Sequence, residues 1–181
     1  ASKNGHLEVL QWWLDSGLEL KYTTSAIDWA SVFGHSEVLQ WWVDSGLELK
    51  YTIYSIDIAS RIEHINVLNW WVNSGLELKY TENTIDLASR NRYVLQWWID
   101  SGLELKYTEL AIDNLSKYGH LKYTLNEIDM ASENEDSELE LNAVDAELET
   151  EYVKILEWWL DSGLELKYTS EAIDKASENG L

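Results

Sequence analysis

The chain has 181 residues, 45% of them apolar, 12% aromatic and 25% charged, which is the composition of a globular protein and excludes one that is disordered throughout. With 33 Asp and Glu against 13 Lys and Arg its formal net charge is −20, which argues against nucleic acids and anionic membranes as partners. It has no cysteine, no long apolar run and no signal-peptide pattern, so the sequence predicts no disulfide, no membrane insertion and no secretion.

A 13-residue string recurs along the chain and sets its architecture. It reads QWWLDSGLELKYT from Gln11 and returns with few changes from Gln40, Asn69, Gln96 and Glu157, at offsets of 29, 29, 27 and 61 residues. Ten of the eleven tryptophans lie in these strings. The aromatic content therefore belongs to a structural repeat and not to a cofactor site.

The first half of each repeat predicts a helix. Thr23 stands before the helical pattern, where its hydroxyl can accept a hydrogen bond from an N–H of the first turn. Ile27, Ala30 and Ser31 then fall on one face, and the small Ala30 and Ser31 allow another helix to approach closely. Gly34 ends the pattern, as glycine does after many helices. Threonine takes the capping position in the other clear copies, at Thr52, Thr81, Thr108, Thr124 and Thr169.

The second half of each repeat predicts another helix, which begins after His35 and ends at Gly46. Its apolar stripe consists of Val38, Leu39, Trp42 and Val43. Of each Trp pair, one ring is expected to face the seam between repeats and the other to lie nearer the surface. A single helix pair cannot bury this stripe, but stacked copies can, so the predicted fold is an all-α solenoid with short loops and no substantial sheet.

The repeat resembles the ankyrin repeat. Residues 34–38 read Gly-His-Ser-Glu-Val, as in the family's G-H-x-E-V, and an apolar triplet and x-x-G follow. The resemblance covers most of the chain and implies stacked helix pairs that bind proteins on a concave surface of loop tips and first helices. The period of 29 residues is shorter than the family's, roughly 33, so the projecting hairpin is reduced. The Thr-Pro start is absent, and Asp28 stands where the family has its motif histidine.

The regular spacing is lost in one part of the chain. We therefore expect regular ankyrin-like repeats at 1–119, an irregular acidic segment at 120–152, and a final repeat and half-repeat at 153–181. Partial matches within the segment indicate degenerate repeats that lack second helices. The alternatives are one deletion with a 16-residue acidic insertion, or a sequence deduced imperfectly from other data. Residues 120–181 carry a net charge of −13, which fits either a solvated acidic segment or a dock for a basic partner.

The repeated polar residues indicate structure rather than chemistry. The four histidines share one turn position, and equivalent positions in stacked repeats lie roughly 10 Å apart, too far to share a metal ion. An aspartate recurs in the first helices, where we expect it to tie helix to loop, with repeated lysines as partners. The aspartates are Asp28, Asp57, Asp86, Asp113, Asp129, Asp145 and Asp174, and the lysines are Lys21, Lys50, Lys79, Lys106 and Lys167. No nucleophile stands beside a base and no phosphate-binding glycine loop occurs, so the sequence predicts neither an enzyme nor a cofactor or metal.

Positions that differ between copies are the candidates for contact with a partner. They lie at the start and the end of first helices, and one group combines aromatic and apolar side chains with arginines, the composition of binding hot spots. These candidate contact residues are Trp29, Phe33, Tyr54, Arg61, Ile62, Arg90 and Arg92. The alternative is drift at exposed sites, because Arg61 and Arg90 also suit helix C-termini without any partner.

The two ends of the chain carry complementary halves of a repeat. The first residues form a second helix without its first helix, and the last residues form a first helix without its second. Side chains that we expect to be open to water there are Leu7, Leu10 and Trp13 at one end and Ile173 and Ala176 at the other. Head-to-tail association of these ends would propagate as a fibre unless it closes a ring. The alternative is that 1–181 is an excerpt of a longer array.

The sequence thus predicts a non-catalytic protein-interaction scaffold inside the cell, whose partner is a protein, and a basic protein if the acidic segment is the dock. Two other functions stay open. One is a self-assembling structural protein that stacks head-to-tail into filaments. The other is an idealised or reconstructed repeat sequence without a natural function.

Overall fold

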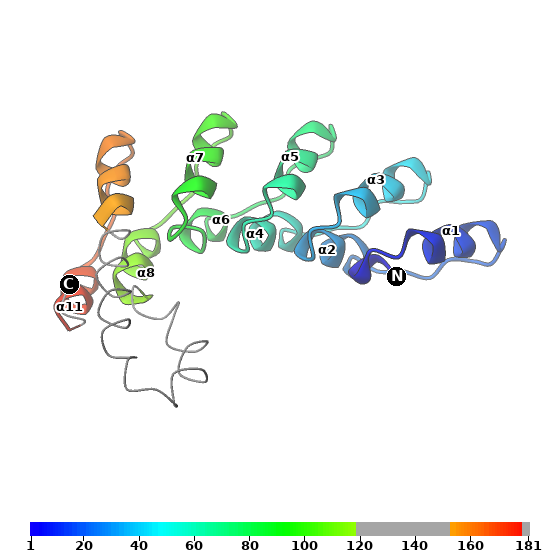
Figure 1. The fold of residues 1–181 in the computed structure, drawn as a ribbon, viewed down its shortest axis with the longest axis horizontal. Coiled ribbons are helices and arrows are strands. Elements are labelled where there is room, and N and C mark those ends of the chain that lie inside the picture. Colours follow the sequence, from blue (N-terminus) through cyan, green and yellow to red (C-terminus); the bar gives the residue numbers. More distant parts are fainter. Residues whose placement is uncertain (119–152, 179–181) are drawn as a thin grey trace, which may run out of the picture. The chain divides into compact units, whose positions relative to one another are not determined.

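The computed structural model describes residues 1–118 and 153–178, with side chains to residue 116 in the first range. Every regular element in these two ranges is a helix and none is a strand, which confirms the predicted all-α class (Figure 1). The elements are η1 (Ser2–Asn4), α1 (Leu7–Asp15), α2 (Ser25–Val32), α3 (Ser36–Asp44), α4 (Tyr54–Arg61), α5 (Ile65–Asn73), α6 (Asn83–Asp86), α7 (Arg92–Asp100), α8 (Leu110–Tyr118), a helix at 153–161, and α11 (Ser170–Glu178). They form two compact units, the first of which is Ala1–Ala88 with Tyr93–Lys106.

In the first unit, helices pair in a repeating pattern. The first helices α2, α4 and α6 pack side by side in one row, and the second helices α3, α5 and α7 form another row (Figure 1). Within a repeat, α2 packs against α3 and α4 packs against α5. The short η1 packs against α2 and so takes the place of a first helix in the row. This is the stacking of helix pairs that the repeat predicted.

Each first helix starts just after its threonine. Thr23 Oγ1 accepts a hydrogen bond from the Ser25 amide (3.3 Å), and Thr52 Oγ1 accepts one from the Tyr54 amide (3.2 Å). The amide donors are the first residues of α2 and α4, so the hydroxyl satisfies an N–H that has no partner within the helix. The predicted capping role is confirmed. The same bond recurs at Thr81, Thr108 and Thr169.

The tryptophan pairs divide between seam and surface as predicted. In three of the first unit's four pairs the second ring is at most 3% exposed, at Trp42, Trp71 and Trp98, whereas in the first pair Trp13 is 43% exposed. The first ring is only partly buried, at Trp41, Trp70 and Trp97. Small residues let the first helices approach each other, because Ala30 and Ala59 are fully buried between them.

One side chain expected to be open at the ends is buried. Leu10 is 7% exposed, because it takes the position that the corresponding buried leucines hold in the following copies, so the expectation is wrong for this residue. Among the others, Trp13 and Ile173 are exposed, and Leu7 and Ala176 are partly buried. Head-to-tail association stays a prediction.

The first helix α6 is shorter than the repeat predicts. It spans four residues, whereas α4 spans eight. This copy has two residues fewer between Ser89 and Val94 than the preceding copy has between Ser60 and Val67. The chain must therefore leave the helix early to reach the start of α7.

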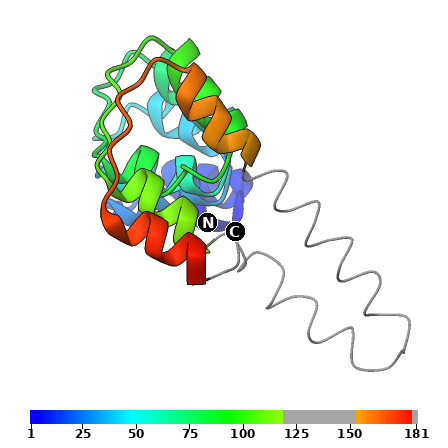
Figure 2. The ribbon, with the colours of Figure 1, turned by 90° about the vertical axis from the view of Figure 1, so that its left-hand side faces the viewer.

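The second unit contains α8, the helix at 153–161 and α11 (Figure 2). Its contacts repeat those of the first unit at a longer spacing along the chain. Tyr107 donates a hydrogen bond to the carbonyl of Glu165, 58 residues later, as Tyr22 does to Glu48, 26 residues later. In addition, α8 packs against α11 as neighbouring first helices do. The degenerate repeats predicted at 120–152 lie outside the described residues.

The turn between the two helices of a repeat needs a left-handed residue. Gly34 has a φ of 79°, and a Cβ placed on it would lie 3.1 Å from Cε1 of His64 in the next repeat. In that next repeat the equivalent residue is Glu63, with a φ of 66°, the one non-glycine residue of positive φ in the described part of the chain. The turn histidine of one repeat thus packs on the turn of the repeat before it.

Replacing Glu63 with glycine is expected to raise the free energy of unfolding by roughly 0.5–1 kcal/mol, because it removes the strain of a left-handed side-chain-bearing residue. The reciprocal Gly34→Ala should lower this free energy, since its Cβ would also press on the His64 ring. Urea unfolding of both variants, followed by tryptophan fluorescence, measures the two changes. Changes of the same sign would contradict the strain argument.

Candidate interaction surface

A buried carboxylate holds each first helix to the next repeat. Asp28 is 8% exposed and accepts hydrogen bonds from the amide and the hydroxyl of Thr52 (2.8 and 3.0 Å) and from the hydroxyl of Ser55 (2.7 Å). Its oxygens are thereby satisfied within the fold. The pattern recurs from Asp57 to Thr81 and Thr84 and, in the second unit, from Asp113 to Thr169. The structural role predicted for these aspartates is confirmed.

The repeated lysines lie over tyrosine rings, and the prediction that they pair with the aspartates is wrong. Lys79 Nζ lies 4.4 Å from the centre of the Tyr51 ring. That ring lies 4.8 Å from the Trp71 ring, and its hydroxyl donates to the carbonyl of Glu77 (3.0 Å). The physical reason is that threonine and serine donors already occupy the aspartates, whereas the ring face attracts a cation. Lys50, Lys106 and Lys167 lie in the same way over Tyr22, Tyr80 and Tyr107.

The two tryptophans of a pair make different hydrogen bonds, which the sequence analysis missed. The buried Trp71 donates to Ser31 Oγ of the preceding repeat (3.1 Å). The outer Trp70 donates to Gln40 Oε1 of the preceding repeat (3.0 Å), and the amide of Gln40 donates to Asp44 (2.9 Å). The sequence contains a signal for the outer hydrogen bond, because a residue with a side-chain acceptor (Gln, Asn or Glu) stands before every Trp pair. Residues that recur in every copy thus serve contacts between neighbouring repeats.

We expect stability to fall as the pH rises above about 10, the pKa of an unfolded tyrosine. Burial raises the pKa of Tyr51, Tyr80 and Tyr107, and neighbouring glutamates raise it further. Below the unfolded pKa both states are protonated and the contribution is complete. At higher pH the unfolded chain loses protons that the folded chain keeps, so stability is lost as the pH approaches the folded pKa.

Urea unfolding at a series of pH values from about 8 to 11 measures this loss. In the Tyr51→Phe variant the decline should be shallower, because one of the shifted groups is gone. A free energy of unfolding that stays constant over the whole range would contradict the assignment.

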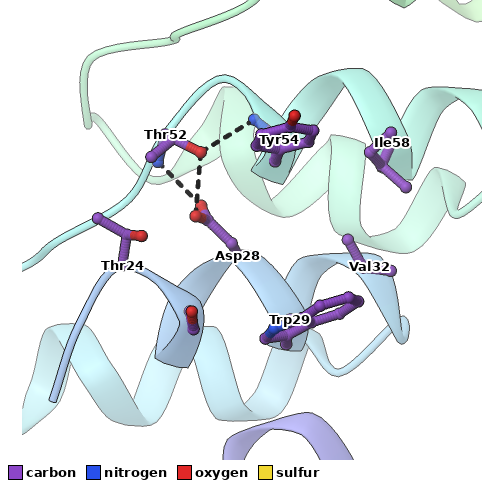
Figure 3. Close-up of a pocket in the computed structure, with 8 residues that line it drawn as sticks. Thr24, Asp28, Trp29, Val32, Thr52, Tyr54 and Ile58 are labelled. Atoms are coloured by element: carbon purple, nitrogen blue, oxygen red, sulfur yellow. Dashed lines mark hydrogen bonds between the residues drawn. The ribbon is translucent and has the colours of Figure 1, made fainter.

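A groove opens between α2 and α4 (Figure 3). Trp29 and Val32 on α2 lie across from Tyr54 and Ile58 on α4, and the groove has a volume of about 550 Å³. The three hydrogen bonds of Asp28 lie at its edge and hold the carboxylate to Thr52 and Ser55. The groove therefore offers shape and apolar surface for binding, and the polar groups at its edge serve the contact between repeats.

Three of the predicted contact residues come together at this groove. Trp29 and Tyr54 line it and are 45% and 60% exposed, and the Phe33 ring lies 5.7 Å from that of Trp29. Arg61 and Ile62 are exposed one turn beyond Ile58 on α4, so they extend the same wall. Arg90 and Arg92 belong to the second unit, are partly exposed and do not line the groove.

Lys3 is a further residue of this surface that was not predicted, and its ammonium lies 5.3 Å from the Trp29 ring centre and 4.9 Å from that of Phe33. A signal was available, because Lys3 follows Ala-Ser just as Arg61 does in α4. Val32 and Ile58 were likewise not predicted as lining residues. Their role depends on how α2 and α4 are aligned, which a single repeat does not reveal.

The N-terminal part of the chain is similar to one known family. A family model described as ankyrin repeats (many copies) matches residues 1–41. This part of the chain is therefore similar to ankyrin repeats. The matched residues include α2, which forms one wall of the groove. Compared with curated proteins and with solved structures, the chain has no match. None of its described helices is long and apolar enough to cross a bilayer.

Proposed function

We propose that this ankyrin-repeat protein is a non-catalytic protein-interaction scaffold, and that its partner docks at the α2–α4 groove. Ankyrin repeats commonly mediate contacts between proteins. The observation that carries the proposal is the pair of large, exposed aromatic side chains, Trp29 and Tyr54, on helices whose buried residues are held by contacts between repeats. Exposed aromatic residues in a well-formed groove are typical anchors of protein interfaces.

The copies within the chain support the same surface. One position holds Trp29 in α2, and the equivalent residues in the later copies that the structure describes are Ile58, Leu87, Asn114 and Lys175. The residue just before it is aspartate in each of these five copies. Residues of the seam are therefore fixed, while the groove residue differs from copy to copy. This is the pattern expected where one repeat carries the specificity and all repeats carry the fold.

A display library of random short peptides, panned against the immobilised full chain, tests the proposal. Enriched peptides should bind the Trp29→Ala/Tyr54→Ala variant at least about tenfold more weakly, because truncating one anchor alone costs about 2 kcal/mol or more. Trp12→Ala is the matched control, since Trp12 is 60% exposed on α1, outside the groove, and its loss should leave binding unchanged. Peptides that bind the groove variant as well as the wild type would refute the proposal.

The expectation of a basic partner concerns the acidic residues of 120–152, which lie outside the described part of the chain. The basic partner is therefore a separate prediction, independent of the proposal that a partner docks at the groove. Its test is binding of a basic peptide to the full chain, compared with binding to a variant whose carboxylates in that segment are changed to amides.

A further inference from the structure

The face that holds the groove differs in charge from the rest of this acidic chain. The elements η1, α2 and α4 contain four charged side chains. Asp28 and Asp57 are buried and bonded to the next repeat, whereas Lys3 and Arg61 are exposed. These three elements therefore present only positive charge to the solvent, in a chain whose net charge is −20.

Four exposed carboxylates flank this face on residues outside η1, α2 and α4. Glu63 follows α4 and Glu82 precedes α6, and both are exposed. Glu8 and Glu37 stand at the starts of second helices, where each lies within 4.0 Å of a turn histidine. None of these residues lines the groove. The apolar walls are thus bordered by Arg61 at the end of α4 and by Lys3 on the neighbouring η1.

We propose that the groove accepts an acidic segment of a partner protein, with apolar side chains between Trp29 and Tyr54 and carboxylates at Lys3 and Arg61. The inference rests on the proposed function and adds the chemistry of the partner. Arginine is suited to the role because its planar guanidinium can bind a carboxylate through two hydrogen bonds. Lys3 keeps its charged end over the Trp29 and Phe33 rings, next to where the partner would lie.

The row of helices also sets the spacing of the carboxylates. Lys3 and Arg61 hold equivalent positions two helices apart in the row η1, α2, α4. Neighbouring helices pack about 8–10 Å apart, which places the two cations roughly 16–20 Å apart. An extended chain advances about 3.3 Å per residue, so the segment should carry acidic residues about five or six positions apart.

The panned peptides test this inference through their charge. At low salt the pool that depends on Trp29 and Tyr54 should be enriched in Asp and Glu. Lys3→Glu and Arg61→Glu should each weaken binding of these peptides about fivefold to tenfold, and added salt should reduce the difference. Lys21→Glu is the matched control, because it changes the net charge equally at an exposed position away from the groove. It should change binding less than about twofold.

The outcomes separate the two proposals. Peptides that need Trp29 and Tyr54 but show no acidic enrichment, and that bind Arg61→Glu as well as the wild type, would overturn the inference and leave the proposed function standing. Peptides that ignore the groove variants would overturn the proposed function itself. Association of the chain with itself, abolished by Arg61→Glu and seen by light scattering, would assign the groove to a second copy and overturn a separate partner.

A different observation carries a second inference, about how the array continues in the second unit. Three seam contacts have the same partners in both units but different spacings. The hydrogen bond from a tyrosine hydroxyl to a glutamate carbonyl spans 26 residues from Tyr22 and 58 residues from Tyr107. The bond from a threonine amide to an aspartate spans 24 residues from Asp28 and 56 residues from Asp113. The bond from a lysine to a tyrosine carbonyl spans 28 residues from Tyr51 and 60 residues from Tyr107. Each spacing is longer by the same 32 residues.

From this constant shift we infer that residues 121–152 are a single insertion within one repeat, between its first helix α8 and its second helix at 153–161. Joining His120 directly to Val153 restores the Gly-His turn before Val-Lys-Ile-Leu-Glu-Trp-Trp. It also shortens the offset from Trp98 to Trp159 from 61 residues to the regular 29. One insertion therefore accounts for the irregular spacing without any lost helix.

A variant that lacks 121–152 tests the insertion. It should unfold in one cooperative transition and keep the near-UV circular dichroism of the tryptophans, with a Tm no lower than that of the full chain by more than about 4 °C. The control is a deletion of the same length at 113–144, which removes Asp113 and most of α8 and should abolish the second unit's part of the transition. If both deletions destabilise the chain equally, the segment belongs to the array and the inference is overturned.

Discussion

Replacing Trp42 with alanine is expected to lower the free energy of unfolding by about 3–5 kcal/mol, the usual cost of deleting a large buried aromatic side chain. Trp42 is 3% exposed, its indole donates to Ser2 Oγ (3.1 Å), and its ring lies 4.7 Å from that of Tyr22. The substitution leaves a cavity at the seam and a buried hydroxyl without its donor. Urea unfolding followed by far-UV circular dichroism measures the loss without relying on the fluorescence of the removed ring.

The neighbouring Trp41→Ala is the control for size and aromatic character. Trp41 is only partly buried and donates to Gln11 Oε1 (2.9 Å) at the surface. Its loss should cost about 1 kcal/mol, the net value of an ordinary hydrogen bond with some packing. Equal losses for the two variants would show that the assignment of one ring to the seam and one to the surface is wrong.

Asp57→Ala is expected to cost about 3 kcal/mol, because hydrogen bonds to a charged group contribute about 1.5–3 kcal/mol and their donors would stay buried. The side chain is 3% exposed and accepts from the amide and the hydroxyl of Thr81 (2.9 and 2.6 Å) and from the hydroxyl of Thr84. Removing the carboxylate should destabilise the next repeat, because the start of its first helix is held by hydrogen bonds to Asp57. Equilibrium urea unfolding of the full chain measures it.

Two variants check the cause. Asp57→Asn keeps the shape but turns an NH2 group toward donors, so it should destabilise as well, although less than alanine because one acceptor remains. Asp44→Ala removes an exposed aspartate that accepts only from Gln40 in the same helix (2.9 Å), and its effect should stay within about 0.5 kcal/mol. If Asp57→Ala costs no more than Asp44→Ala, the carboxylate does not hold the seam.

The helix pair of each repeat could be predicted because its signals are local. A capping threonine, an apolar stripe of helical spacing and a glycine at the turn all lie within a few residues of the elements they define. The division of each Trp pair follows from the same argument, since neighbours on a helix cannot both face inward. The resemblance to ankyrin repeats added the order of stacking, which periodicity alone does not supply.

Contacts between repeats could not be predicted in the same way. The partners of Asp28 lie 24 to 27 residues further along the chain, and charge alone suggested the lysines. The lining of the groove by Val32 and Ile58 depends on how two helices are aligned. Likewise, the early end of α6 follows from two missing residues in the connection to α7, beyond the helix itself.

The bonds of Asp28 and Ser31 give the array a direction. Both belong to α2, one helical turn apart, and both accept from later repeats: Asp28 from the start of α4, and Ser31 from Trp71 on α5. A folded first helix therefore already presents the acceptors that position both helices of its successor. If the repeats fold in the order of their synthesis, each new repeat meets acceptors that are already in place on its N-terminal side.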